Sequence, residues 1–382
     1  MAITLPVFLF LACLLLFGRG VYLFVPFYRA QVEGSRHHKF QSLDGLRGFL
    51  AFGVVIHHSV CYTYFFREAR WATDSEFYNG LGSHCVSLFF MITGFLFWSK
   101  VITKRGHIPV RDFLKSRALR ILPMYFFSTF IVLILIGYKS NWELRTDLAA
   151  FIREITRVLC GGWFGYGEIN KSGNDILNGV FWTLKAEWRF YISIPFLGYF
   201  FYQPRTRSLL LMFLVFLFCR FVTNEVNYFQ FVIGGIAAEI VHLQKWNKYL
   251  QSRLASLIAF CALAIPFGIL GAGYTWIQTF VLGVFFVCVS GGNTLFGVLK
   301  WSASIFLGTI SYSVYLIHMS ILFICFTTLS RVADLSALTP LQIWTFTICC
   351  GFLILSISAL SYRYIEFRFI ERRKSSVEVI SA

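Results

Sequence analysis

Long apolar segments recur along most of this chain, and no other feature restricts its possible folds so strongly. Of the 382 residues, 57% are hydrophobic and only 14% are charged. A soluble protein of this size could not keep so much apolar surface away from water. Transmembrane barrel strands alternate apolar and polar residues, whereas these segments are apolar on all faces. The sequence therefore predicts an all-α fold, a polytopic bundle of transmembrane helices.

Ten core spans are predicted from the apolar runs, near residues 45–66, 80–99, 121–138, 179–201, 208–223, 226–243, 254–270, 273–290, 303–327 and 340–364. A further apolar run, Leu5 to Phe27, precedes them. It could be a cleaved signal peptide, but its first residues carry no Lys or Arg and no small-residue cleavage site follows it. We therefore expect a retained additional helix.

The expected organisation follows from these spans. Residues 1–39 are assigned as the N-terminal apolar helix and a cytoplasmic linker, residues 40–374 as the transmembrane domain, and residues 375–382 as a cytoplasmic tail.

Basic residues indicate how the bundle is oriented. Every second connection between the predicted spans is rich in basic residues. Together these connections hold 22 of the 34 Lys and Arg residues, within 29–47, 100–120, 205–207, 245–253, 300 and 363–374. The positive-inside rule places these connections in the cytoplasm and the others outside. The net charge of +16 is accounted for by this bias and by attraction to the anionic headgroups of membrane lipid, so it gives no reason to expect nucleic acid as a partner. We expect a multi-pass protein of the cell (inner or plasma) membrane.

The longest outer connection runs over residues 139–178 and contains the stretch "GGWFGYGEINKSGND". Its glycines and aromatic residues would suit a lid or a platform for a sugar. A disordered connector fits the same composition, and the sequence does not choose between these interpretations.

One apolar segment, "LDGLRGFLAFGVVIHH", carries ionisable residues that are costly to keep in a membrane. Arg47 and His58 are eleven residues apart, just over three helical turns, so they share a helix face. With Arg47 at the cytoplasmic boundary, His58 lies roughly 16 Å deeper, near the midplane, and His57 points about 100° away. This pattern suits a substrate with an anionic group at the boundary and a reactive group inside. The alternative is a snorkelling arginine and a histidine that only joins helices.

The same segment resembles the signature of the membrane acyltransferase-3 family, an arginine followed by ten residues and a histidine. Five further stretches resemble the motifs of this family, in the family order. They are "SLFFMITGFLF" with Thr93, "RALRILPMY" with Arg117 and Arg120, "FWTLKAEWRFYISIP" with Glu187, "LGTISYSVYLIHMS" with Ser311, Tyr312, Tyr315 and His318, and "SYRYIEFRFI" with Glu366. Each motif alone is weak, but six in order are specific, and together they cover residue 40 to the end of the sequence.

Some positions depart from the family pattern. Thr183 replaces a usual Ser, Trp188 and Arg189 replace Glu-Gln, and Phe367 and Phe369 flank Arg368. These changes weaken any inference about the acceptor. Some relatives carry an additional extracytoplasmic hydrolase-like domain, and we expect none here, because the sequence ends a few residues after the last predicted span.

The resemblance implies an integral membrane O-acyltransferase. Such an enzyme transfers an acyl group, commonly acetyl from acetyl-CoA, to a hydroxyl of a carbohydrate or glycolipid acceptor. Its catalytic residues would be His58, as a general base, with Arg47 and Glu187. A covalent acyl-histidine is the alternative for His58.

The resemblance also suggests which residues bind the substrates. Guanidinium groups fit phosphate well, so Arg117 and Arg120, together with Arg47, are candidates for binding the cytosolic acyl-CoA. We expect Arg117 and Arg120 to lie at a water-accessible boundary. The candidates for binding the acceptor or the acyl group are Asp44, Thr93, Trp182, Tyr312 and His318. No metal is expected.

Other interpretations remain open at this stage. Arg117 and Arg120 could be ordinary positive-inside charge, and Glu187 could form a structural ion pair with Lys185 or Arg189. A secondary transporter or flippase for a glycan or lipid-linked substrate is the main alternative, with an unwound helix at Gly234 and Gly235. The acceptor itself is open among polysaccharide, lipopolysaccharide, peptidoglycan precursor and small secondary metabolite.

Overall fold

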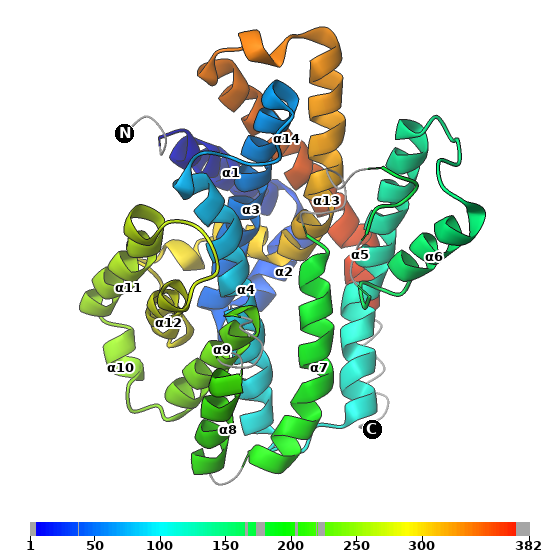
Figure 1. Ribbon diagram of the computed structural model, residues 1–382. Coiled ribbons are helices and arrows are strands. Elements are labelled where there is room, and N and C mark those ends of the chain that lie inside the picture. The colour runs from blue at the N-terminus through cyan, green and yellow to red at the C-terminus, as the bar shows by residue number, and fades with distance from the viewer. Residues whose placement is uncertain are drawn as a thin grey trace. The chain divides into compact units, whose positions relative to one another are not determined.

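The fold is all-α, as predicted (Figure 1). The structure, a computed structural model, describes residues 5–36, 38–164, 167–172, 180–202, 205–218, 220 and 226–371. These described residues form helices and contain no strand, only an isolated bridge between Ile169 and Ser172. The helices are α1 (Leu5–Phe24), α2 (Pro26–Ser35), α3 (Gln41–Glu68), α4 (Glu76–Thr103), α5 (Val110–Lys139), α6 (Leu148–Leu159), α7 (Trp182–Phe201), α8 (Arg205–Phe218), α9 (Val226–His242), α10 (Asn247–Leu250), α11 (Arg253–Ile265), α12 (Trp276–Ser290), α13 (Ser302–Val332) and α14 (Pro340–Ser361).

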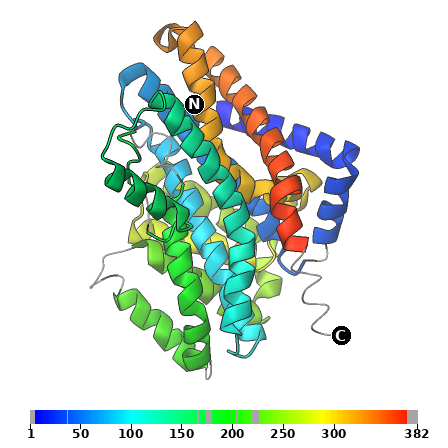
Figure 2. The ribbon, with the colours of Figure 1, turned by 90° about the vertical axis from the view of Figure 1, so that its right-hand side faces the viewer.

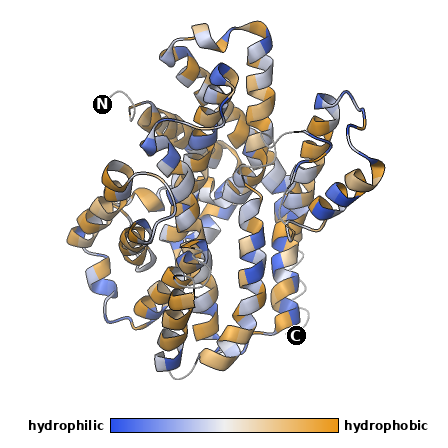
Figure 3. Cartoon of the chain, viewed as in Figure 1, coloured by the Kyte–Doolittle hydropathy of each residue, from blue (hydrophilic) through white to orange (hydrophobic). Residues whose placement is uncertain are grey.

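Seven helices in the described part of the chain are long and apolar enough to cross a membrane, by length and composition. They are Leu5–Phe24, Gln41–Glu68, Glu76–Thr103, Val110–Lys139, Arg253–Leu270, Ser302–Val332 and Pro340–Glu371. Large apolar side chains such as Phe8, Phe130 and Phe260 are exposed on them, and hydrophobic residues cover much of their length (Figure 3). The protein is therefore a multi-pass membrane protein.

The predicted number of spans is not confirmed, although every predicted span overlaps a helix. Three of the other helices are short, since α8, α9 and α12 have 14, 17 and 15 residues. Helix α7 has 20 residues but carries Lys185, Glu187 and Arg189, which make it less apolar.

The chain folds into two compact units, and three segments of sequence contribute to each. The first takes its described residues from 1–57, 73–109 and 192–311, and the second from 58–72, 110–191 and 312–382. The predicted boundaries of the transmembrane domain stay a prediction.

Glycines set the packing of α4 against α9 in the first unit. Gly94 lies against the carbonyl oxygen of Phe231, and Gly234 lies against that of Met91. Small residues allow two membrane helices to approach closely, backbone to backbone. Gly234 lies within the α-helix Val226–His242, so the glycines that were candidates for an unwound transport helix instead serve helix packing.

Local sequence explains where α14 begins, in the second unit. Thr339 and Gln342 form a reciprocal capping box, and Pro340 occupies the first helical turn. The chain has just turned back from α13, and the rings of Phe326 and Phe346 are 5.1 Å apart between centroids. Figure 2 shows α13 and α14 running side by side beyond this turn.

The connection over residues 139–178, which the sequence predicts to lie outside, contains an unpredicted helix, α6. Asp147 caps it by accepting a hydrogen bond from the Ala150 amide at 2.8 Å, and Tyr125 donates to the carbonyl of Val158 at 2.6 Å. The interpretation as a disordered connector is therefore wrong for Leu148–Leu159. Residues 165–166 and 173–175 of the glycine-rich stretch lie outside the described residues.

We predict that Gly94→Ala lowers the thermal stability of the protein, because a Cβ at this position would lie 2.1 Å from the Phe231 carbonyl oxygen. Overpacking of this kind typically costs about 1–3 kcal/mol. Thermal unfolding of the protein in detergent, followed with a thiol-reactive dye, measures the effect. Gly20→Ala is the matched control, since nothing lies within 4 Å of a Cβ there and alanine favours a helix. Equal unfolding temperatures for Gly94→Ala and the parent would contradict the packing role.

Candidate functional site

One uninterrupted helix, α3, carries the arginine and the histidine of the signature. Arg47 and His58 both lie within Gln41–Glu68, so their helical spacing follows from the sequence. His58 is buried, and His57 beside it is less so. The two histidines have different partners, because consecutive residues point about 100° apart on a helix. His57 Nδ1 lies 2.9 Å from the carbonyl oxygen of Tyr78 in the first unit.

The partner of His58 is a second histidine, His318 on α13. Nδ1 of His58 lies 3.0 Å from Nε2 of His318, and their exposed fractions are 5% and 0%. Nδ1 of His318 lies 3.0 Å from the carbonyl oxygen of Val314, one turn earlier on the same helix. The Trp71 ring stacks on His58 with 6.3 Å between ring centroids. The second unit thus contains two buried imidazoles in direct contact.

Tyr315, one turn before His318 on α13, connects this pair to the start of α7. Its ring centroid lies 6.2 Å from that of His318. Its hydroxyl lies 3.2 Å from Oγ1 of Thr183 and donates to the carbonyl of Val180 at 3.3 Å. Thr183 replaces the usual Ser, yet it keeps the hydroxyl that this contact uses, so that departure from the family pattern preserves the local chemistry.

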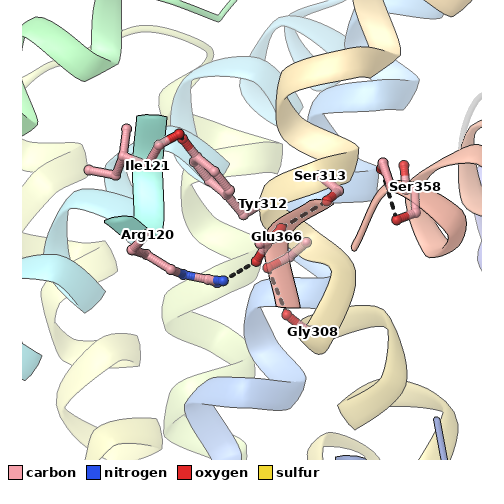
Figure 4. A network of polar contacts seen from close by, with 9 residues as sticks. Arg120, Ile121, Gly308, Tyr312, Ser313, Ser358 and Glu366 are labelled. Atoms are coloured by element: carbon pink, nitrogen blue, oxygen red, sulfur yellow. Dashed lines mark hydrogen bonds and ion pairs between the residues drawn. The ribbon is translucent and has the colours of Figure 1, made fainter. Parts of the chain in front are cut away.

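A buried ion pair forms a second polar cluster in this unit (Figure 4). Arg120 on α5 pairs with Glu366, in the π-helical turn that follows α14. Ser313 donates to Glu366 Oε2 at 2.8 Å. The Arg120 guanidinium carbon lies 5.5 Å from the centroid of the Tyr312 ring, and Tyr312 donates to the Ile121 carbonyl at 2.9 Å. Three helical segments of the second unit, from α5, α13 and the end of α14, meet at this cluster.

Arg120 is partly exposed, whereas its partner is buried. The Arg120 side chain is 22% exposed and that of Glu366 is 1% exposed, and the water-accessible boundary expected for Arg120 stays a prediction. A carboxylate this deeply buried requires a compensating cation. The partner, 246 residues away in sequence, could not be assigned from helix spacing.

The other candidates of the second unit lie on α5 and α7. Arg117 Nη2 donates to Ser116 Oγ at 3.1 Å. Glu187 Oε2 accepts a hydrogen bond from the Tyr191 hydroxyl at 2.7 Å, one turn along α7. Trp182, the first residue of α7, is half-buried.

Three of the predicted residues belong to the first unit. Asp44 and Arg47 are half-buried on α3, and Thr93 is half-buried on α4. Asp44 Oδ2 lies 3.1 Å from Nδ1 of His38.

Within the second unit, the structure brings together residues that the sequence analysis proposed separately. His58 meets His318, and Tyr312 meets Arg120. The sequence analysis assigned no role to Ser313 or Trp71. The four-residue separation of Val314 and His318 was available as a signal, because it places a histidine within reach of its own helix backbone. Among the described residues, no group of three or more His, Cys, Asp or Glu side chains could hold a metal ion.

Comparison with known proteins identifies the family. The model of the acyltransferase-3 family, described as an acyltransferase domain, matches residues 40–363. The chain belongs to this family, which confirms the resemblance seen in the six motifs and the predicted class of enzyme.

A curated relative supports the same class. The Bacillus subtilis (strain 168) protein named "Putative peptidoglycan O-acetyltransferase YrhL" is 25% identical over 335 residues, which cover 75% of this chain and 49% of the relative. This chain thus matches about half the length of that protein. No solved structure matches this chain.

The Arg120–Glu366 pair leads to a prediction about stability. Arg120→Ala should destabilise the protein by about 3–5 kcal/mol, because it leaves the Glu366 carboxylate buried without its cation. Arg120→Met combined with Glu366→Gln should recover much of this loss, since the double variant removes both charges. Thermal unfolding in detergent measures both effects.

Arg111→Ala is the matched control, because Arg111 is exposed on the same helix. A loss for Arg120→Ala no larger than for this control would contradict the structural role of the pair. So would a double variant as unstable as Arg120→Ala.

Proposed function

We propose that the protein is an integral membrane O-acyltransferase that moves an acyl group, acetyl by default, from cytosolic acetyl-CoA to a hydroxyl group. The acceptor is an extracytoplasmic or membrane-associated carbohydrate or glycolipid, and the enzyme resides in the cell membrane. The main support is the family signature, Arg47 and then His58, with His58 buried on an apolar helix. The name of the Bacillus subtilis relative favours a cell-wall glycan among the carbohydrate acceptors.

The chemistry requires one base. In this proposal a ring nitrogen of His58 takes the proton of the acceptor hydroxyl, and the hydroxyl oxygen attacks the thioester carbonyl carbon. A carbon–oxygen bond forms and the carbon–sulfur bond breaks. The coenzyme A thiolate leaves and takes the proton from the imidazolium. The products are the ester and free coenzyme A, and His58 returns to its starting state.

Arginines are proposed to hold the donor. Coenzyme A carries several phosphates, and guanidinium forks match phosphate geometry. Arg117, Arg120 and Arg47 are the candidates, and a phosphate at Arg120 would share that guanidinium with Glu366. All three are half-buried, so their hydrogen bonds are only partly screened by water.

Glu187 is proposed to act on the acceptor. Its carboxylate accepts a hydrogen bond from Tyr191, and carboxylate oxygens are also the acceptors that sugar hydroxyls require. Trp182 and Thr93 remain proposed contacts of the substrates, as do Asp44 and Tyr312.

We predict that His58→Ala abolishes transfer while His57→Ala keeps it within a few-fold. Loss of a general base typically costs about 10²–10⁴-fold in rate. The measurement is alkali-labile acetate on purified peptidoglycan and surface polysaccharide, from cells that express each variant in a strain lacking the gene. Expression is matched by immunoblot. Parent-level acetate in the His58→Ala strain would rule out His58 as the base.

We also predict that Arg117→Ala weakens binding of acetyl-CoA to the purified protein by about 10–100-fold, the loss expected for a charge-assisted hydrogen bond. Binding of S-acetylpantetheine, which lacks the phosphates, should change less than twofold. Isothermal titration calorimetry measures both constants, with Arg111→Ala as the exposed control on the same helix. If Arg117→Ala weakened the binding of acetyl-CoA and of S-acetylpantetheine equally, Arg117 would not contact the phosphates.

A further inference from the structure

Hydrogen atoms on histidine rings must be inferred from the partners of the two nitrogens, and His318 has a decisive partner. Its Nδ1 lies 3.0 Å from the carbonyl oxygen of Val314. A carbonyl oxygen only accepts hydrogen bonds, so Nδ1 of His318 carries a hydrogen and donates it. In a neutral ring the other nitrogen, Nε2, then holds the lone pair and can only accept.

That lone pair faces His58. Nε2 of His318 lies 3.0 Å from Nδ1 of His58, so Nδ1 of His58 must be the donor. Both rings are buried within apolar helices, where a charge is costly, and this favours the neutral state of both. The chain of donors therefore runs from His58 to His318 to the Val314 carbonyl, and the lone pair of His58 is left on Nε2.

We propose that His318 is a positioning residue that fixes His58 as the Nδ1–H tautomer and so makes Nε2 the basic nitrogen. The role in catalysis rests on the proposed acyl transfer, whereas the tautomer is a property of the protein alone. The family resemblance alone suggests His318 as a substrate contact. The geometry instead directs its accepting nitrogen at the proposed base, in the way that a third group orients the base of a catalytic triad.

The orienting group here is neutral. When Nε2 of His58 takes a proton, the ring becomes an imidazolium, and its Nδ1–H bond to His318 becomes charge-assisted and stronger. The Val314 carbonyl, one turn earlier on α13, holds the His318 ring in place. The His318 ring in turn holds His58, the proposed proton acceptor. The ring of Trp71 on His58 and that of Tyr315 beside His318 restrict the two imidazoles further.

The first test determines the tautomer of His58 directly and does not depend on enzymatic activity. Solid-state NMR of ¹⁵N-histidine-labelled protein in lipid bilayers separates protonated from bare ring nitrogens, and the His58 signals are assigned by their loss in His58→Gln. The parent should show a protonated Nδ1 and a bare Nε2 for His58. A bare Nδ1 in the parent would overturn the proposal.

The second test asks whether the acceptor on His318 matters for rate. His318→Phe keeps an aromatic ring but removes the accepting nitrogen, while His318→Gln places an amide oxygen near the position of Nε2. His318→Phe should lose the Nδ1–H signature of His58 and lower kcat by about 10²–10⁴-fold, the range for a base held in the wrong tautomer, with KM for acetyl-CoA within about twofold. His318→Gln should restore the signature and most of kcat.

The outcomes separate this inference from the proposed function. If His318→Phe kept both the tautomer and the parent kcat, the positioning role would be wrong. If His318→Gln failed as badly as His318→Phe while showing the Nδ1–H signature, the role in catalysis would likewise be wrong. If the parent showed the expected tautomer but His58→Ala transferred acetate as the parent does, the proposed base would fall, and the assignment of the His58–His318 hydrogen bond would stand.

Discussion

Every polar group that lies between apolar helices needs a partner inside the protein, because hydrocarbon offers none. This constraint organises the second unit. The Glu366 carboxylate is held by Arg120 and Ser313, and the His58 imidazole by His318. These contacts tie the end of α3, helices α5 and α13 and the turn after α14 to one another. The residues that are most costly to bury are thus the ones that fix how these segments pack.

The sequence predicted the helices well, because an apolar run long enough to cross a membrane is a local property. The number of spans is not confirmed, because α7 carries three charges and α8, α9 and α12 are short. Helix α6 was missed because its capping residue, Asp147, stands in a polar connection where no long apolar run marks a helix.

The candidate site was predictable one helix at a time. Arg47 and His58 share a helix, so their spacing could be derived from its period. The partner of His58 is 260 residues away and that of Arg120 is 246 residues away, and no periodicity reports a contact between distant helices. Family motifs named His318 and Glu366 without giving their contacts. The structure supplies these contacts, and it pairs Arg120 with the buried carboxylate of Glu366.

The contact between His318 and Val314 links ring chemistry to the winding of α13. The two residues are four apart, so the carbonyl of one reaches the ring of the other only while that turn keeps its α-helical pitch. A turn wider by one residue, as in the π-helical segment Tyr362–Glu366, would separate the Val314 carbonyl from the His318 ring. Nε2 of His318 could then carry the hydrogen and donate it to His58. A small change of pitch in the middle of α13 would then decide which ring nitrogen of His58 can take up a proton.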